Sequence, residues 1–85
     1  MRAFEVSVNG ERLCSAGIGD DGVLTTIVSW LARPSGGSMH LEVGGLISQT
    51  KEHVTWVRQK PLSLGDTVQV KIVEIEAADN PTNKD

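Results

Sequence analysis

Pro61-Leu-Ser-Leu-Gly-Asp-Thr-Val-Gln-Val-Lys-Ile-Val-Glu-Ile-Glu76 is the stretch that most clearly indicates the fold of this chain. Within it, Gly65-Asp66 is typical of a turn. Apolar and polar residues then alternate, with Val68, Val70 and Ile72 on the apolar side. This is the period of a strand that buries one face. The other segments can be interpreted as what this strand packs with.

The alternation changes phase near the end of the same stretch. Val73 and Ile75 are apolar, whereas Glu74 and Glu76 are polar. A regular strand cannot change phase and keep one face buried. We therefore predict a bulge or sharp bend near Ile72–Val73, where the strand passes between sheets or turns a barrel corner.

The N-terminal segment predicts a β-hairpin. Residues 3–9 alternate, with Phe4, Val6 and Val8 on one side, and Asn9-Gly10 favours a type I′ turn. A two-residue loop would give the pairs Val8–Glu11, Val6–Leu13 and Phe4–Ser15, with Cys14 facing Glu5.

Residues 23–33 fit two structures. As a helix, 21–33 would start at Asp20 or Asp21 and end before Pro34. As a strand, both faces would be apolar. Five of the six residues over 23–28 are β-branched, which favours the strand. Val28-Ser-Trp-Leu31 also resembles Val54-Thr-Trp-Val57, and we interpret both as strands with a similar role.

The remaining segments complete a β-rich pattern. Residues 34–38 predict a flexible loop tip, and 39–43 and 53–59 predict strands, with a bulge or turn at Gly44-Gly45. We predict one all-β domain over 1–78, with about six antiparallel strands in a compact sandwich or partly open barrel. The alternative is an α+β fold with a helix at 21–33. Residues 79–85 lack periodicity and predict a polar flexible tail.

Charge and composition limit the partners and the compartment. The 85-residue chain has a net charge of −3 and only eight scattered Lys or Arg residues. This argues against nucleic acid and against an anionic membrane surface, since both attract clustered cations. Cys14 is the only cysteine, which excludes an internal disulfide and fits a reducing compartment. Because the N-terminus also lacks an apolar stretch of signal-peptide length, we expect a cytoplasmic protein.

Two tryptophans are the main candidates for an interaction site. Trp30 and Trp56 occupy equivalent places in the two similar segments, and Arg33 and Arg58 follow them closely. Core packing is the simpler role for such large apolar groups. The alternative is an exposed anchor for a partner, with the arginines as a polar rim.

A metal site or a catalytic nucleophile has less support in the sequence than an interaction site. His40, Glu42 and His53 are metal-ligand types, but their spacing matches no zinc motif, and no cofactor is predicted. Cys14 is interpreted as a small buried apolar residue rather than a nucleophile. We therefore predict no metal site and no catalytic residues.

Several segments together resemble a known group of proteins. They are Phe4–Gly10, Gly22–Trp30, Leu41–Leu46, His53–Trp56 and Pro61–Asp66. They resemble a group of short, uncharacterised bacterial proteins with no assigned activity, over nearly the whole chain up to about Ala78. The resemblance implies a bacterial, cytoplasmic, free-standing domain and assigns no site residues.

These observations favour a non-catalytic protein-interaction module of accessory, inhibitor or immunity type. The partner would be another protein or a second copy of the chain, since an unpaired edge strand allows a homodimer. The alternative is a small-ligand or metal-binding module that uses the region of His40, Glu42 and His53.

Overall fold

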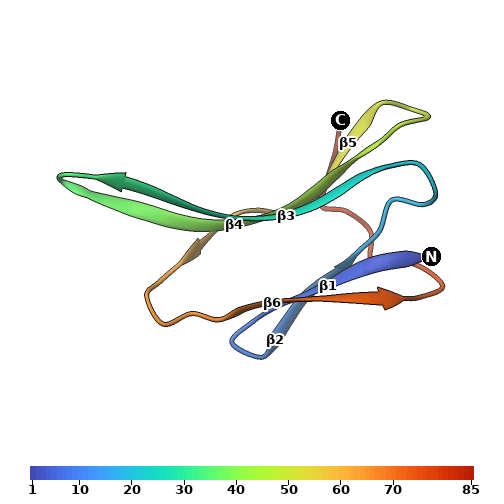
Figure 1. Ribbon diagram of the computed structural model, residues 1–85. Helices are drawn as coiled ribbons and strands as arrows, with labels where there is room; N and C mark the ends of the chain where they lie inside the picture. The colour runs from blue at the N-terminus through green and yellow to red at the C-terminus, as the bar shows by residue number, and fades with distance from the viewer.

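The computed structural model describes residues 1–85 and contains strands but no helix. The strands are β1 (Arg2–Val8), β2 (Glu11–Ala16), β3 (Gly22–Arg33), β4 (Gly36–Ile47), β5 (Glu52–Leu62), β6 (Val68–Glu74) and β7 (Asn83–Lys84). They form two antiparallel sheets, in the orders β2-β1-β6 and β3-β4-β5-β7. The sheets face each other as a sandwich and do not close into a barrel (Figure 1). The predicted all-β class is confirmed, and the alternative helix at 21–33 is wrong.

The first hairpin has the expected turn but not the expected register. Asn9 and Gly10 have φ values of 53° and 82°, as a type I′ turn requires. Val8 pairs with Glu11, but a bulge between Val6 and Ser7 then shifts the ladder. The observed pairs are Val6–Cys14, Glu5–Ser15 and Phe4–Ala16. The expected pairs Val6–Leu13 and Phe4–Ser15 are therefore wrong, because the extra β2 residue moves Cys14 and Ala16 to the core face.

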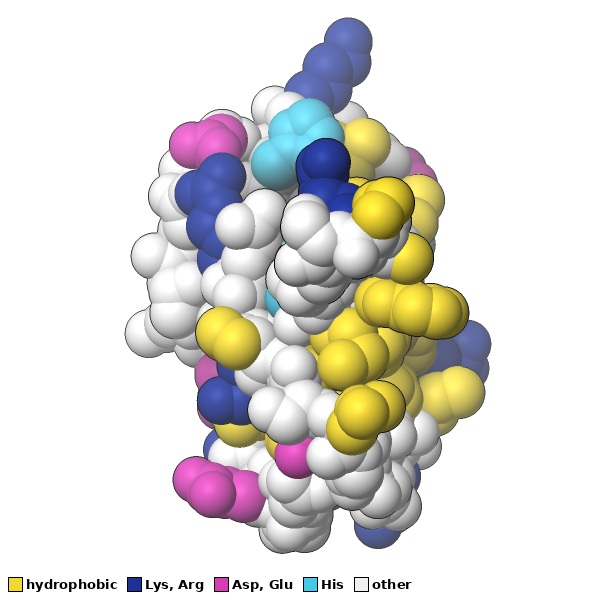
Figure 2. Space-filling model, turned by 90° about the vertical axis from the view of Figure 1, so that its left-hand side faces the viewer, with side chains coloured by type: hydrophobic (Ala, Val, Ile, Leu, Met, Phe, Trp, Pro, Cys, Tyr) yellow, Lys and Arg dark blue, Asp and Glu magenta, His cyan; other side chains and the backbone are white.

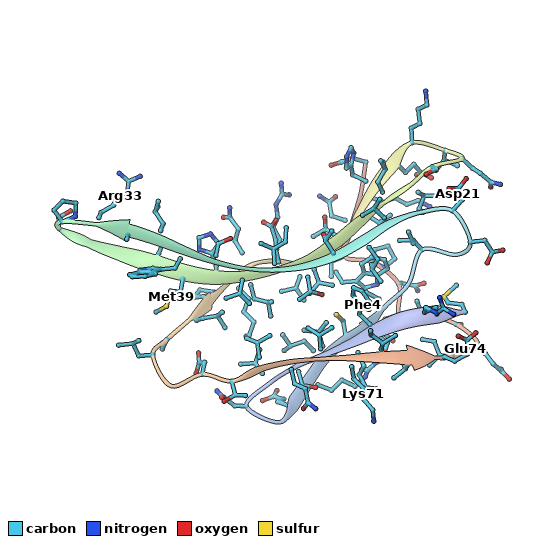
Figure 3. All side chains as sticks on the ribbon, in the orientation of Figure 1. Phe4, Asp21, Arg33, Met39, Lys71 and Glu74 are labelled. Atoms are coloured by element: carbon cyan, nitrogen blue, oxygen red, sulfur yellow. The ribbon has the colours of Figure 1, made fainter.

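The core fills the space between the sheets where they overlap. Val6, Val8, Cys14 and Ala16 from the smaller sheet meet Leu41, Val43, Val54 and Trp56 from the larger one. Phe4 also points into this layer (Figure 3). Since small sandwiches bury little surface, this cluster must supply most of the apolar stabilisation.

The β3–β4 hairpin is longer than the sandwich. Its register is continuous from Gly22–Ile47 to Arg33–Gly36, so only Pro34-Ser35 forms the turn. The predicted loop over 34–38 is therefore too long. The hairpin projects beyond the smaller sheet as an arm (Figure 1), and the molecule is 43 Å long. Side chains on the arm have no opposite sheet to pack against.

Close strand approach explains Gly44-Gly45. A Cβ on Gly45 would lie 2.5 Å from the main-chain oxygen of Val23 on β3. The pair does not interrupt β4, as a turn would; instead the pairing with β5 changes register around Val43. The glycines thus allow a continuous strand at an irregular point of the sheet.

β6 is straight where a bulge was expected. Its ladder with β1 runs without a shift from Val8–Val68 to Arg2–Glu74. The prediction of a bend near Ile72–Val73 is therefore wrong. The change of phase is tolerated because β6 is an edge strand, and Ile72 stays 70% exposed on the face that points inward.

The C-terminal segment is held rather than free. β7 pairs with Val54 and Thr55 of β5. The Asp79 carboxylate accepts hydrogen bonds from the Arg12 side chain at 2.8 Å and from the Ser15 main chain at 2.9 Å. The expectation of a flexible tail at 79–85 is corrected, because this segment forms hydrogen bonds with groups of β2 and pairs with β5 at the edge of the sandwich.

Candidate interaction surface

Alternate residues of β3 face the smaller sheet. Leu24, Thr26, Val28 and Trp30 lie opposite Gly45, Val43, Leu41 and Met39 of β4. Residues directly opposite each other in a sheet share a face. Leu41 and Val43 are fully buried, so this is the inward face of β3. Towards the hairpin end, however, the inward face has nothing beneath it, and Trp30 is 75% exposed.

The inward face of β6 is also open. Val68, Val70 and Ile72 lie opposite Val8, Val6 and Phe4, which face the core. Val68 packs against the core, whereas Val70 and Ile72 are exposed. β6 and β3 are both edge strands, each paired on one side only. The sandwich is thus open along an edge of each sheet.

We call the exposed apolar residues on the inward faces of β3 and β6 and on the loop before β6 the open surface. Its members are Val28, Trp30, Leu64, Val70 and Ile72. From their exposed fractions, they present on the order of 500 Å² of apolar area, at the upper end of what a monomer usually exposes. Figure 2 shows hydrophobic side chains gathered along one side of the end from which the hairpin projects. Apolar patches of this size are often functional.

A hollow lies beneath the arm, within the open surface. It has a volume of about 360 Å³ and is lined by Trp30, Gly37, Ser38, Met39 and Leu64. Met39 points down from the arm towards it (Figure 3). Because Leu64 is 92% exposed, the hollow has an apolar wall that a partner's side chain could cover.

Thr26 adds a polar group at the same edge. Its hydroxyl oxygen is buried and has no hydrogen-bond partner. Such an oxygen costs about 1–3 kcal/mol relative to a paired one.

The two tryptophans differ completely in their surroundings. Trp56 is only 6% exposed, and its Nε1 donates to the Asp79 main-chain oxygen. Trp56 is therefore corrected from a candidate interaction residue to a core residue. Trp30, for which core packing was the simpler prediction, is exposed. The difference arises because β5 lies inside its sheet and over the smaller sheet, whereas β3 is an edge strand that overhangs it.

The two arginines do not form a common rim. Arg33 lies at the end of the arm, three residues beyond Trp30 (Figure 3). Arg58 lies on β5 where the pairing jumps from Val43–Val57 to Leu41–Lys60. Across the sheet, Trp30 of β3 lies opposite Met39 of β4, which lies opposite Leu62 of β5. Arg58 is not part of this line of neighbours. Arg33 is nearer to Trp30 along the chain, but it lies on the outer face of β3, whereas Trp30 lies on the inward face.

The three residues considered as metal ligands, His40, Glu42 and His53, lie on the outer face of the larger sheet. A shallow groove of about 290 Å³ brings together Glu42 and His53 above Gly44 and Gly45. His40 lies on the same outer face, opposite Ser29, but does not line the groove. No three His, Cys, Asp or Glu side chains lie close enough to hold a metal ion.

Cys14 is buried in the core cluster. Burial raises the pKa of its thiol, and the negative charge of Asp79 raises it further, against a smaller opposing effect of Arg12. A nucleophilic cysteine needs the reverse, a lowered pKa and an accessible sulfur. The interpretation of Cys14 as a small apolar residue agrees with this environment.

Comparison with known proteins adds nothing to this site: no protein-family model, curated protein or solved structure matches the chain. The structure contains no helix long and apolar enough to cross a membrane. Sequence reasoning identified Trp30 and Arg33 as candidates but missed Leu64, Val70 and Ile72. Their alternation indicates an inward face, and only the sheet order shows that this face is uncovered.

Proposed function

We propose that this protein is a non-catalytic protein-interaction module that binds its partner through the open surface. The observation that carries the proposal is Trp30, a large aromatic side chain that is 75% exposed among other exposed apolar residues. Tryptophan is enriched at the energetic centres of interfaces, where its area is buried at little entropic cost.

The surroundings of Trp30 support a protein partner. The free edges of β3 and β6 offer main-chain groups for strand addition. The net charge of −3 favours a partner that is neutral or basic at the contact. Accessory, inhibitor and immunity proteins all act by such binding. We also propose that the module is bacterial and cytoplasmic, which the single unpaired cysteine supports because a free thiol fits a reducing compartment.

Photo-crosslinking from position 30 tests the proposal. A photoreactive amino acid replaces Trp30 in one variant and Gln49, an exposed residue of the β4–β5 turn, in the control. We expect a discrete crosslinked product from position 30 and none from position 49. Added wild-type protein, which lacks the photoreactive group, should compete for the partner and reduce that product. Added Trp30→Ala protein should reduce it much less. Equal labelling from both positions, or no discrete product from position 30, would contradict the proposal.

The outer groove supports a second candidate, a small-ligand module. Glu42 and His53 converge there with Thr25 and Thr55. Binding of a small polar ligand or divalent ion would raise the melting temperature, and Glu42→Gln would abolish the rise. No shift across such compounds would rule this candidate out.

A further inference from the structure

The free edge of β3 is available for hydrogen bonding. β3 pairs only with β4, and it has 12 residues. The main-chain oxygens of Val23 and Leu31 point towards β4, where they closely approach Gly45 and Gly37. Main-chain groups alternate in direction along a strand. The N–H and C=O groups of Leu24, Thr26, Val28 and Trp30 therefore point outwards from the free edge.

This edge lacks the features that normally prevent strand pairing. From Gly22 to Ala32 it carries neither a charged residue nor a proline. The other large edge strand, β6, has Lys71 and Glu74, both visible in Figure 3. Natural proteins protect exposed edges with such charges, and a long apolar edge without them is a template for another strand.

The sequence of β3 is complementary to itself when read in reverse about Ile27. The aliphatic Val23 corresponds to Leu31, and Leu24 corresponds to Trp30. The hydroxyl-bearing Thr25 corresponds to Ser29, and the small Gly22 corresponds to Ala32. Outside them, the carboxylate of Asp21 corresponds to the guanidinium of Arg33. These last two residues lie at opposite ends of β3 (Figure 3).

A two-fold axis between identical antiparallel strands produces this correspondence. Each residue then faces its mirror position in the partner, and the central residue faces itself. A register centred on Val28 would instead place Val23 opposite Arg33 and Thr25 opposite Leu31. A register centred on Thr26 would place Asp21 opposite Leu31. The Ile27 register matches apolar, hydroxyl, small and charged residues at five of its six pairs, and only Thr26 opposite Val28 combines a hydroxyl with an apolar residue.

The same register places Trp30 over the partner's open surface. Trp30 and the partner's Leu24 become direct neighbours on the inward face. That face looks towards β6, where the partner's Ile72 is exposed. The arm of each copy would therefore cover the open edge of the other.

We propose that the occupant of the open surface is a second copy of this chain, joined by antiparallel β3–β3 pairing centred on Ile27. The inference rests on the proposed function, because it names the partner of that same surface. The exposed apolar side chains of β3, together with Ile72, offer on the order of 600 Å² per copy, close to the ~800 Å² per partner of a standard interface. The two-fold axis also gives two Asp21–Arg33 ion pairs per dimer.

Cysteine crosslinking tests the register. Ile27→Cys would lie opposite itself across the axis and should form a disulfide-linked dimer under mild oxidation. Val23→Cys is the matched control, because Val23 shares the strand, the outer face and the exposure but would lie opposite the partner's Leu31. We expect no disulfide-linked dimer from this control or from wild type, whose Cys14 is buried. Equal crosslinking of Ile27→Cys and Val23→Cys would overturn the register.

Charge reversal tests the ends of the same pairing. Arg33→Asp would bring two carboxylates together at each end and should weaken self-association roughly 3- to 10-fold. The double variant D21R/R33D restores opposite charges and should recover wild-type affinity to within about 2-fold. Failure of the double variant to recover would contradict the Asp21–Arg33 pairing.

Sedimentation of the purified chain separates this inference from the proposed function. Dimerisation that depends on concentration and is lost in Ile27→Lys supports the second copy as the partner. A chain that remains monomeric up to millimolar concentration overturns the self-pairing. In that case a different protein crosslinked at position 30 would still support the interaction module. If no crosslinked product forms at all, both the interaction module and the self-pairing are contradicted.

Discussion

Trp56 donates its indole N–H to the main-chain oxygen of Asp79, with a separation of 2.8 Å. This bond joins the core of the larger sheet to the segment after β6. The side chain of the same Asp79 accepts hydrogen bonds from Arg12 and from the Ser15 main chain on β2. One residue of the C-terminal segment thus connects both sheets at one edge of the sandwich.

The two tryptophans should respond oppositely to truncation. Trp56→Ala leaves a cavity and an unpaired Asp79 oxygen, and we expect it to lower the free energy of unfolding by about 3–5 kcal/mol. Trp30→Ala removes an exposed side chain and should change it by less than about 0.5 kcal/mol. Urea titration at a concentration that keeps the chain monomeric measures both. Similar losses in the two variants would contradict the assigned environments.

The Asp79 carboxylate should matter for stability although it lies in the polar C-terminal segment. Asp79→Ala leaves the N–H of the buried Ser15 without its acceptor, at a cost of about 1–3 kcal/mol. Asp85→Ala is the matched control, since only the main chain of Asp85 is bonded, to His53. Thermal unfolding of both variants checks this. Equal melting temperatures for them would argue that the segment contributes nothing through its side chain.

Acid should weaken the link between the first hairpin and the start of β6. The Asn9 side chain and the Ser63 main chain donate hydrogen bonds to the Asp66 carboxylate, and these bonds lower the pKa of Asp66. A carboxylate with a lowered folded pKa stabilises the fold above its unfolded pKa, here 3.8, and loses this contribution as pH falls through the folded value.

Asp66→Asn should therefore flatten the decline in stability below about pH 4. Denaturant titrations between neutral and acidic pH measure this decline, with Asp20→Asn as an exposed control. An unchanged acid profile in Asp66→Asn would show that other groups account for the loss.

Alkali should act through Cys14. Burial raises the pKa of its thiol above the unfolded value of 9.0, so the folded chain holds this proton more tightly. Stability is then unaffected below that value and declines as the pH rises beyond it, because the unfolded chain ionises first. Cys14→Ala should lack this decline.

Reactivity of the same thiol provides a direct measurement. We expect Cys14 to react with a thiol reagent at least ~100-fold more slowly in the folded chain than in urea, because only transient opening exposes it. Labelling of the folded chain at the unfolded rate would show that the sulfur is accessible.

Local features of the sequence were sufficient for most of the strands and for the first turn, but not for the length of the Pro34-Ser35 turn or for β7. Alternation along β1 and β6 and the Asn9-Gly10 turn act over a few residues, so they could be recognised without the fold. The β-branched residues of 23–28 correctly favoured β3 over a helix for the same reason. Registers were less predictable: the bulge beside Val6 depends on which β2 side chains are small enough to pack inwards.

The candidate site was only half predictable. Trp30 and Arg33 are conspicuous by residue type, but nothing local distinguishes Trp30 from Trp56. The alternation of Val70 and Ile72 predicts a buried face, and the bend predicted near Ile72–Val73 assumed that every apolar face must be covered.

The sequence by itself therefore determined the all-β class and the face to which most strand residues belong, because both depend on backbone periodicity. Only the tertiary structure decided which of those faces is covered. β5 lies within its sheet and above the core, so Trp56 is buried, whereas β3 is an edge strand that extends past the smaller sheet, so Trp30 is exposed. Coverage depends on sheet order and on the overlap of the two layers, which are contacts between segments far apart in the chain.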